Sequence, residues 1–200
     1  MLKFLTFTGL CLTSCLAFAD FSYNLGYASE YHYRGIFQKE SSASAGIDYE
    51  NTNGIYAGLW TADVGDGLEV DAYFGYTKET KGVTTSIGAT TYQYTGDFDD
   101  TYNEINLNLG YKMAHLEHSI GKWDGFGNSQ DYSFTAITID FPHNIYTRYG
   151  RFNKDFEGDY YEIGHNTQVY GLDLGISAIF SSKELSSSDE SLVFTMSKTF

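Results

Sequence analysis

The sequence Ser191-Leu-Val-Phe-Thr-Met-Ser-Lys-Thr-Phe200 alternates between two kinds of side chain. Successive side chains of an extended strand point to opposite sides, so residues two apart share a face. One face carries large apolar side chains, those of Leu192, Phe194, Met196 and Phe200. The other face carries smaller or polar side chains, those of Val193, Thr195 and Ser197. The stretch therefore predicts a strand with one apolar face.

The same period of two recurs through most of the chain, between turn signals. It predicts twelve strands, at 21–34, 43–50, 55–62, 68–77, 83–94, 102–111, 115–123, 131–140, 145–152, 160–165, 169–180 and 191–200. At 115–123 and 145–152 the alternation is blurred, and the sequence does not assign the two faces. A composition of 18 Tyr, 15 Phe and 21 Gly with a single proline, Pro142, favours strands and turns over helices.

The first residues have the pattern of an export signal. Lys3 precedes an apolar run from 4 to 16, and Ala17-Phe18-Ala19 is a cleavage pattern, so we expect a signal peptide at 1–19 and one domain at 20–200. Leu12-Thr13-Ser14-Cys15 offers the alternative of a lipidated Cys15. Both cysteines, Cys11 and Cys15, lie in this segment, so the expected mature chain has no disulfide, thiolate catalysis or thiolate metal site.

Beyond the export signal, no apolar stretch approaches the roughly 18 residues that a membrane helix needs. A chain that crosses a bilayer without helices must do so as a closed sheet. We therefore predict an all-β fold, a transmembrane antiparallel up-and-down β-barrel of twelve strands. The formal charge of −14 argues against nucleic acid as a partner.

The links between the predicted strands alternate in length. Short links fall at 51–54, 78–82, 112–114, 141–144 and 166–168, and longer ones at 35–42, 95–101, 124–130, 153–159 and 181–190, with 63–67 a short exception. Bacterial barrels have short periplasmic turns and longer external loops. We therefore expect the N-terminus on the periplasmic side and the acidic longer links outside.

A final strand that ends on an aromatic residue, here Phe200, is similar to the assembly signal of bacterial outer-membrane barrels, although Lys198 stands where an apolar residue is usual. We expect a monomer in the outer membrane of a Gram-negative bacterium. Its expected partners are outer-membrane lipids, lipopolysaccharide and, through Phe200, the barrel-assembly machinery.

Residues 29–76 resemble a known family. The resemblance rests on Ser29-Glu-Tyr31, Arg34-Gly-Ile-Phe-Gln38, Gly46-Ile-Asp-Tyr49, Gly54-Ile-Tyr-Ala-Gly-Leu-Trp60 and Glu69-Val-Asp-Ala-Tyr-Phe-Gly-Tyr76, and it continues more weakly through Asp100-Thr-Tyr-Asn-Glu104. These stretches look like the TorF-type porins of proteobacteria. The resemblance implies an outer-membrane barrel with a channel role and implies no catalytic residues. The link at 63–67 is shorter than is usual there.

The sequence contains no motif that predicts catalysis or a bound cofactor. A barrel phospholipase needs His and Ser at wall spacing, but His118 and Ser119 are adjacent and face opposite sides. His115 and His118 likewise point apart, which argues against a metal site. The acidic run Asp97, Asp99 and Asp100 suits either calcium or simple solvation, and the second is commoner.

The polar faces of the strands give the candidate residues of the lumen. They are Glu30, His32, Arg34, Asp48, Glu69, Asp71 and Glu104. For Arg34 a structural role is weighed against one in selectivity, because an unpaired buried charge is costly. The sequence predicts a porin-like channel for passive diffusion of small polar solutes or ions, with cations favoured. The alternatives are a closed structural or adhesive barrel and a secreted soluble β-sandwich that binds a ligand.

Overall fold

The computed structural model describes residues 20–186 and 190–200. The predicted signal peptide at 1–19, with Cys11 and Cys15, lies outside the described residues, so its cleavage and lipidation stay predictions. Among the described residues, no helix is long and apolar enough to cross a membrane.

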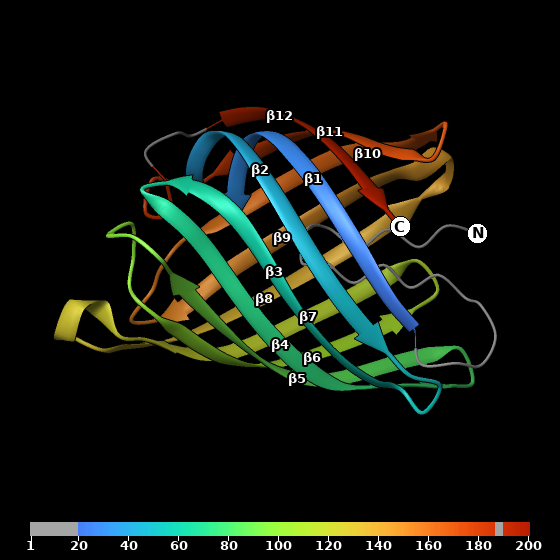
Figure 1. The fold of residues 1–200 in the computed structure, drawn as a ribbon, viewed down its shortest axis with the longest axis horizontal. Coiled ribbons are helices and arrows are strands. Elements are labelled where there is room, and N and C mark those ends of the chain that lie inside the picture. Colours follow the sequence, from blue (N-terminus) through green and yellow to red (C-terminus); the bar gives the residue numbers. More distant parts are fainter. Residues whose placement is uncertain (1–19, 187–189) are drawn as a thin grey trace.

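The described chain forms one closed antiparallel barrel (Figure 1). Its strands are β1 (Asp20–Tyr33), β2 (Ile36–Glu50), β3 (Ile55–Gly65), β4 (Gly67–Thr80), β5 (Val83–Tyr94), β6 (Tyr102–Tyr111), β7 (Ala114–Trp123), β8 (Gln130–Phe141), β9 (Ile145–Lys154), β10 (Asp159–Val169), β11 (Leu172–Ser181) and β12 (Glu190–Thr199). Two short 3-10 turns, η1 (Gly125–Gly127) and η2 (Pro142–Asn144), interrupt the links. Each strand pairs with its sequence neighbours, and β1 pairs with β12. This closure confirms the twelve-strand barrel and rules out the β-sandwich.

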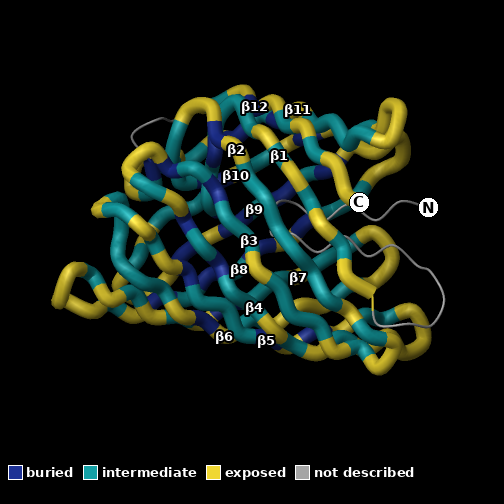
Figure 2. Tube along the Cα trace, viewed as in Figure 1, coloured by how far each residue is buried: buried dark blue, intermediate teal, exposed yellow. Residues whose placement is uncertain are grey.

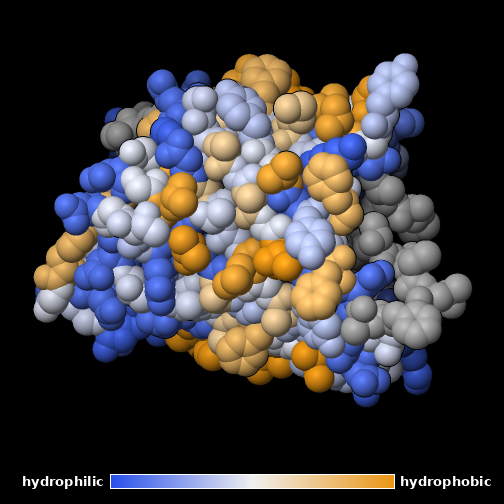
Figure 3. All heavy atoms as spheres, viewed as in Figure 1, coloured by the Kyte–Doolittle hydropathy of each residue, from blue (hydrophilic) through white to orange (hydrophobic). Residues whose placement is uncertain are grey.

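The outer wall is apolar, as the period of two predicts. The side chains that point outward include Phe21, Tyr23, Leu25, Leu68, Phe74, Ile105, Leu107, Leu192, Phe194 and Met196, all of them exposed. Apolar side chains gather across the middle of the face seen in Figure 3, and hydrophilic ones gather at the end with the longer loops. Such a band is what the hydrocarbon core of a bilayer covers. The apolar band therefore marks the part of the wall that spans the membrane, as in an outer-membrane barrel.

One predicted link is wrong by several residues. The residues expected to form the link at 166–168 continue the ladder of β10, where Asn166 pairs with Gly175 and Gln168 with Asp173. The chain turns instead at Tyr170-Gly171, with φ values of 52° and 76°. A two-residue hairpin turn needs positive φ at both positions, and glycine adopts it without cost. Residues 166–168 are polar, so in the sequence they resemble a turn although they belong to the ladder of β10 with β11.

A second expectation, a loop at 35–42, is also wrong, and this correction changes the interior. The chain turns at Arg34-Gly35, with φ values of 50° and 81°, and β2 begins at once. The pairing of β1 with β12 stops at Ala28, and the pairing of β2 with β3 starts at Ser44. Residues 29–43 therefore form a hairpin whose strands pair with each other but not with the wall. We call residues 29–43 the inner hairpin.

The inner hairpin folds into the barrel. On one side Tyr31 packs with Ala62 and Val64, and on the other Tyr33 and Ile36 pack against an aromatic cluster. That cluster contains Tyr132, Phe134, Phe152 and Tyr160. Figure 2 shows buried stretches in dark blue, many of them in the half of the barrel that holds the hairpin. Alternation predicts Tyr31 and Tyr33 on the lipid-facing side, and this is wrong because both faces of an inserted hairpin lie inside.

The alternation of link lengths leads to a prediction of sidedness. The structure places the turn at Asn53-Gly54 at the end where β1 begins and β12 ends, opposite the link between β11 and β12 (Figure 1). An epitope tag between Ser186 and Ser188, a position partly outside the described residues, is expected to be labelled on intact cells. A tag at Asn53-Gly54 is the matched site and is expected to stay unlabelled. Reversed labelling would mean that the termini lie outside.

Candidate functional site in the barrel lumen

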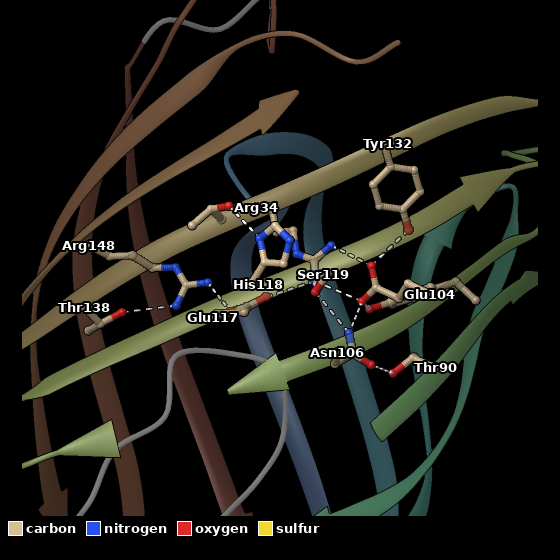
Figure 4. A network of polar contacts seen from close by, with 12 residues as sticks. Arg34, Thr90, Glu104, Asn106, Glu117, His118, Ser119, Tyr132, Thr138 and Arg148 are labelled. Atoms are coloured by element: carbon tan, nitrogen blue, oxygen red, sulfur yellow. Dashed lines mark hydrogen bonds and ion pairs between the residues drawn. The ribbon is translucent and has the colours of Figure 1, made fainter. Parts of the chain in front are cut away.

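The tip of the inner hairpin places an arginine across the lumen. The Arg34 guanidinium donates from Nη1 and Nη2 to the two carboxylate oxygens of Glu104, at 2.8 and 2.9 Å. Its Nη2 also donates to Glu117 at 2.9 Å and to Ser119 at 3.0 Å. The fork of Arg34 thus joins β6 to β7 (Figure 4). Bidentate pairing of this kind is the strongest and most directional contact that arginine makes.

A second arginine continues the network. Arg148 on β9 donates from Nη2 to Glu117 at 2.6 Å and from Nη1 to Thr138 at 3.1 Å. Its Nε donates to the Tyr160 hydroxyl at 2.7 Å. Glu117 therefore lies between the two arginines, and the charges of Glu104, Arg34, Glu117 and Arg148 alternate in sign (Figure 4). The four charges sum to zero.

Glu104 is the acceptor at the centre of this network. Besides Arg34, it accepts hydrogen bonds from the hydroxyls of Tyr92 and Tyr132, at 2.7 and 2.9 Å, and from Asn106 Nδ2 at 2.6 Å. The Tyr132 ring fits because residue 121 is glycine. A Cβ there would lie 2.3 Å from that ring. These donors satisfy a carboxylate that is almost wholly buried.

The aromatic cluster supports Arg34 from the side. The guanidinium carbon lies 4.4 Å from the centroid of the Phe134 ring and 5.0 Å from that of Tyr33. Guanidinium groups are attracted to the faces of aromatic rings, and more strongly where water is excluded. The tip of the inner hairpin is therefore held by charge and by packing together.

The other predicted lumen residues lie inside the barrel but are not partners of Arg34. Glu30 pairs with His32 at 3.0 Å within the inner hairpin. Asp48 accepts hydrogen bonds from Asn24, at 3.1 Å, and from the Tyr73 hydroxyl. Asp48, Glu69 and Asp71 form no ion pair with Arg34, whose ion pairs are with Glu104 and Glu117. The hairpin carries Arg34 away from its own wall neighbours.

Glu69 and Asp71 lie on the lumen face of β4. Both residues are buried, with exposed fractions of 1% and 8%. Glu69 Oε1 accepts a hydrogen bond from the Tyr31 hydroxyl of the inner hairpin at 2.8 Å. Glu69 Oε2 and Asp71 Oδ1 are buried without a hydrogen-bond partner.

Sequence reasoning missed Glu117, Ser119 and Arg148. They lie on β7 and β9, where both faces carry large or polar side chains. The period of two therefore did not show which face of these strands points into the lumen. A signal was present: Leu116 and Ile120 are exposed, and Glu117 and Ser119 occupy the alternate positions. In β9 the alternate residues Tyr146, Arg148, Gly150 and Phe152 are all buried.

Asp99 of the acidic loop, His115 and His118 form hydrogen bonds within the protein. Asp99 accepts from Trp123 Nε1 at 3.0 Å and from the Tyr102 hydroxyl at 2.8 Å. His115 bonds to Asp140 at 3.0 Å, and His118 bonds to Thr135 at 2.8 Å. Within the described ranges, no group of three or more His, Cys, Asp or Glu side chains is placed to hold a metal ion.

The fold and the apolar wall define the class: an outer-membrane β-barrel with an inserted hairpin and a polar interior. The chain belongs to the family described as "Bacterial protein of unknown function (Gcw_chp)", whose model matches residues 15–200. No curated protein sequence matches the chain.

Solved structures share the fold at very low identity. The KdgM porin is 6% identical, with a TM-score of 0.60 over 90% of this chain and 98% of that one. The KdgM porin in complex with disordered oligogalacturonate is 7% identical, with a TM-score of 0.59 over the same shares of 90% and 98%. A membrane protein from work on in-meso crystallization is 9% identical, with a TM-score of 0.63 over 90% of this chain and 83% of that one. At these identities the likeness concerns the fold alone.

Proposed function

We propose that this protein is a porin-like channel for passive diffusion of small polar solutes or ions, with a preference for cations. The observation that carries the proposal is the excess of acid inside the barrel. Arg34 and Arg148 are matched by Glu104 and Glu117, which leaves the carboxylates of Asp48, Glu69 and Asp71 in addition. Fixed charge in a narrow lumen of low dielectric favours ions of the opposite sign.

The resemblance to TorF-type porins and the shared fold of the KdgM porin support a channel role. The ligand in the KdgM complex, oligogalacturonate, is an acidic sugar, and its binding is a property of KdgM. An interior with surplus carboxylates repels such an anion. Among diffusing solutes, neutral and cationic ones therefore suit this lumen best.

We further propose that the inner hairpin sets how wide the channel is. No wall strand pairs with residues 29–43, so side chains hold the hairpin in place. Arg34 and Tyr31 make these contacts at the tip and on the flank, and Lys39 pairs with Asp63 near the base. An element held by side chains leaves the wall intact when it moves.

The filled interior around the inner hairpin favours a second candidate function, that of a closed structural or adhesive barrel. The inner hairpin packs between two apolar clusters and occupies lumen that a wide pore would need. In this case the Arg34 network is a structural plug and carries no ions. Recordings of ionic current distinguish the two candidates.

We propose that the protein is not an enzyme. The adjacent His118 and Ser119 bond to different groups, because His118 contacts Thr135 whereas Ser119 bonds to Arg34 and Asn106. A serine nucleophile needs its base within hydrogen-bonding reach. These two side chains therefore do not form such a pair.

Neutralising the excess acid is expected to weaken cation preference. In Glu69→Gln with Asp71→Asn, the shapes are kept and two negative charges are lost. The reversal potential in a salt gradient, recorded with EDTA so that no divalent cation neutralises the two carboxylates, is expected to shift toward the unselective value, most at low salt, where screening is weakest.

The matched control is Asp124→Asn with Glu157→Gln, which removes two charges from exposed positions on outer loops. It is expected to change the reversal potential far less. Equal shifts from the two double variants would contradict a lumen role for Glu69 and Asp71.

A further inference from the structure

Two buried carboxylates on β4 lack a positive partner. Glu69 and Asp71 are two residues apart on one face of the strand, and neither forms an ion pair with a described Lys, Arg or His. One oxygen of each is buried without a hydrogen-bond partner. Two like charges buried side by side repel each other and have also lost their hydration, so an uncompensated pair is strongly unfavourable.

The basic residues nearby are already committed. Arg34 and Arg148 are held by Glu104 and Glu117, and Lys39 is held by Asp63. The main-chain neighbours of the two carboxylates add aromatic and small side chains: Asp71 lies between Trp60 and Tyr92, and Glu69 between Ala62 and Tyr94. The strand neighbours therefore supply aromatic and small side chains to this pair, and no described basic side chain lies within ion-pair distance of it.

We propose that Glu69 and Asp71 bind a divalent cation of the calcium class inside the barrel. Two carboxylates neutralise its charge, and their two unpartnered oxygens provide hard ligands of the type that calcium prefers. Water completes the shell, which calcium accepts because its coordination geometry is flexible. The Tyr31 hydroxyl bonds to the other oxygen of Glu69, so the cation also fixes the carboxylate that holds the inner hairpin.

Terbium luminescence tests the site directly, because Tb³⁺ replaces Ca²⁺ and is excited by energy transfer from nearby tyrosine. The full-length mature protein, refolded in detergent and stripped with EDTA, is titrated with Tb³⁺. We expect saturable emission that excess Ca²⁺ displaces. This emission should be lost in Glu69→Gln with Asp71→Asn and kept in Asp124→Asn with Glu157→Gln, whose changes lie on exposed loops.

Thermal stability is the second readout, because it does not depend on energy transfer. Ca²⁺ is expected to raise the temperature at which the folded form is lost on a gel in the native protein and in the loop control, but not in the Glu69/Asp71 variant. In EDTA the Glu69/Asp71 variant should be the more stable protein, since it lacks the buried repulsion. Tb³⁺ emission and a Ca²⁺ response equal to native in that variant would overturn the proposal. Failure of native protein to respond to either ion would overturn it as well, and would indicate that the pair is neutralised by protons. Both readouts are independent of whether the barrel conducts.

Discussion

Arg34→Ala is expected to destabilise the barrel by about 3–5 kcal/mol, the usual cost of removing one partner from a buried ion pair. The side chain is 4% exposed, and it is the only charged partner of Glu104 among the described residues. Its loss leaves Glu104 with hydroxyl and amide donors alone, while Glu117 keeps Arg148. Urea unfolding of the refolded protein in detergent measures the loss.

The matched control is Arg151→Ala, which removes an exposed arginine from β9. It is expected to change the free energy of unfolding by less than about 1 kcal/mol. Arg34→Lys should recover only part of the loss, because an ammonium does not reproduce the bidentate fork. An Arg34→Ala protein as stable as Arg151→Ala would show that the network contributes nothing to holding the hairpin.

Excising the inner hairpin is expected to raise single-channel conductance several-fold. Ala28 and Ser42 pair directly across β1 and β2, so an Asn-Gly turn in place of 29–41 closes the two strands without disturbing the wall register. The excision removes the side chains of Tyr31, Tyr33 and Arg34 from the lumen. Conductance in planar bilayers is the measurement.

Shortening the η1 loop between Asp124 and Ser129 is the matched control, because this loop lies at the same end of the barrel and Phe126 on it is exposed. It is expected to leave conductance unchanged. Equal conductance of native and hairpin-excised protein would show that residues 29–43 do not restrict the path.

The sequence was sufficient to predict most of the wall, because the lipid-facing band is largely apolar and alternation records that need at most strands. Leu68 and Phe74 of β4 and Leu192 of β12 point outward as predicted. Alternation fails at Tyr31 and Tyr33, because a hairpin inserted into the lumen has no lipid face. No local pattern separates a hairpin inside a barrel from one in its wall.

The partners within the lumen were harder to predict than its residues. Glu69, Asp71 and Glu104 were placed on interior faces by alternation, and their side chains are buried in the structure. The pairing of Arg34 with Glu104 joins residues 70 apart in sequence, and it depends on where the inner hairpin ends. Such a contact is set by the three-dimensional path of the chain, which the period of two does not encode.

Planar-bilayer recording of the refolded, unaltered protein tests directly whether the barrel conducts. We expect discrete current steps, with a reversal potential in a salt gradient that shows cation preference. Correctly folded, pure protein that gives no steps at any salt concentration would contradict the channel and leave the closed structural barrel as the function.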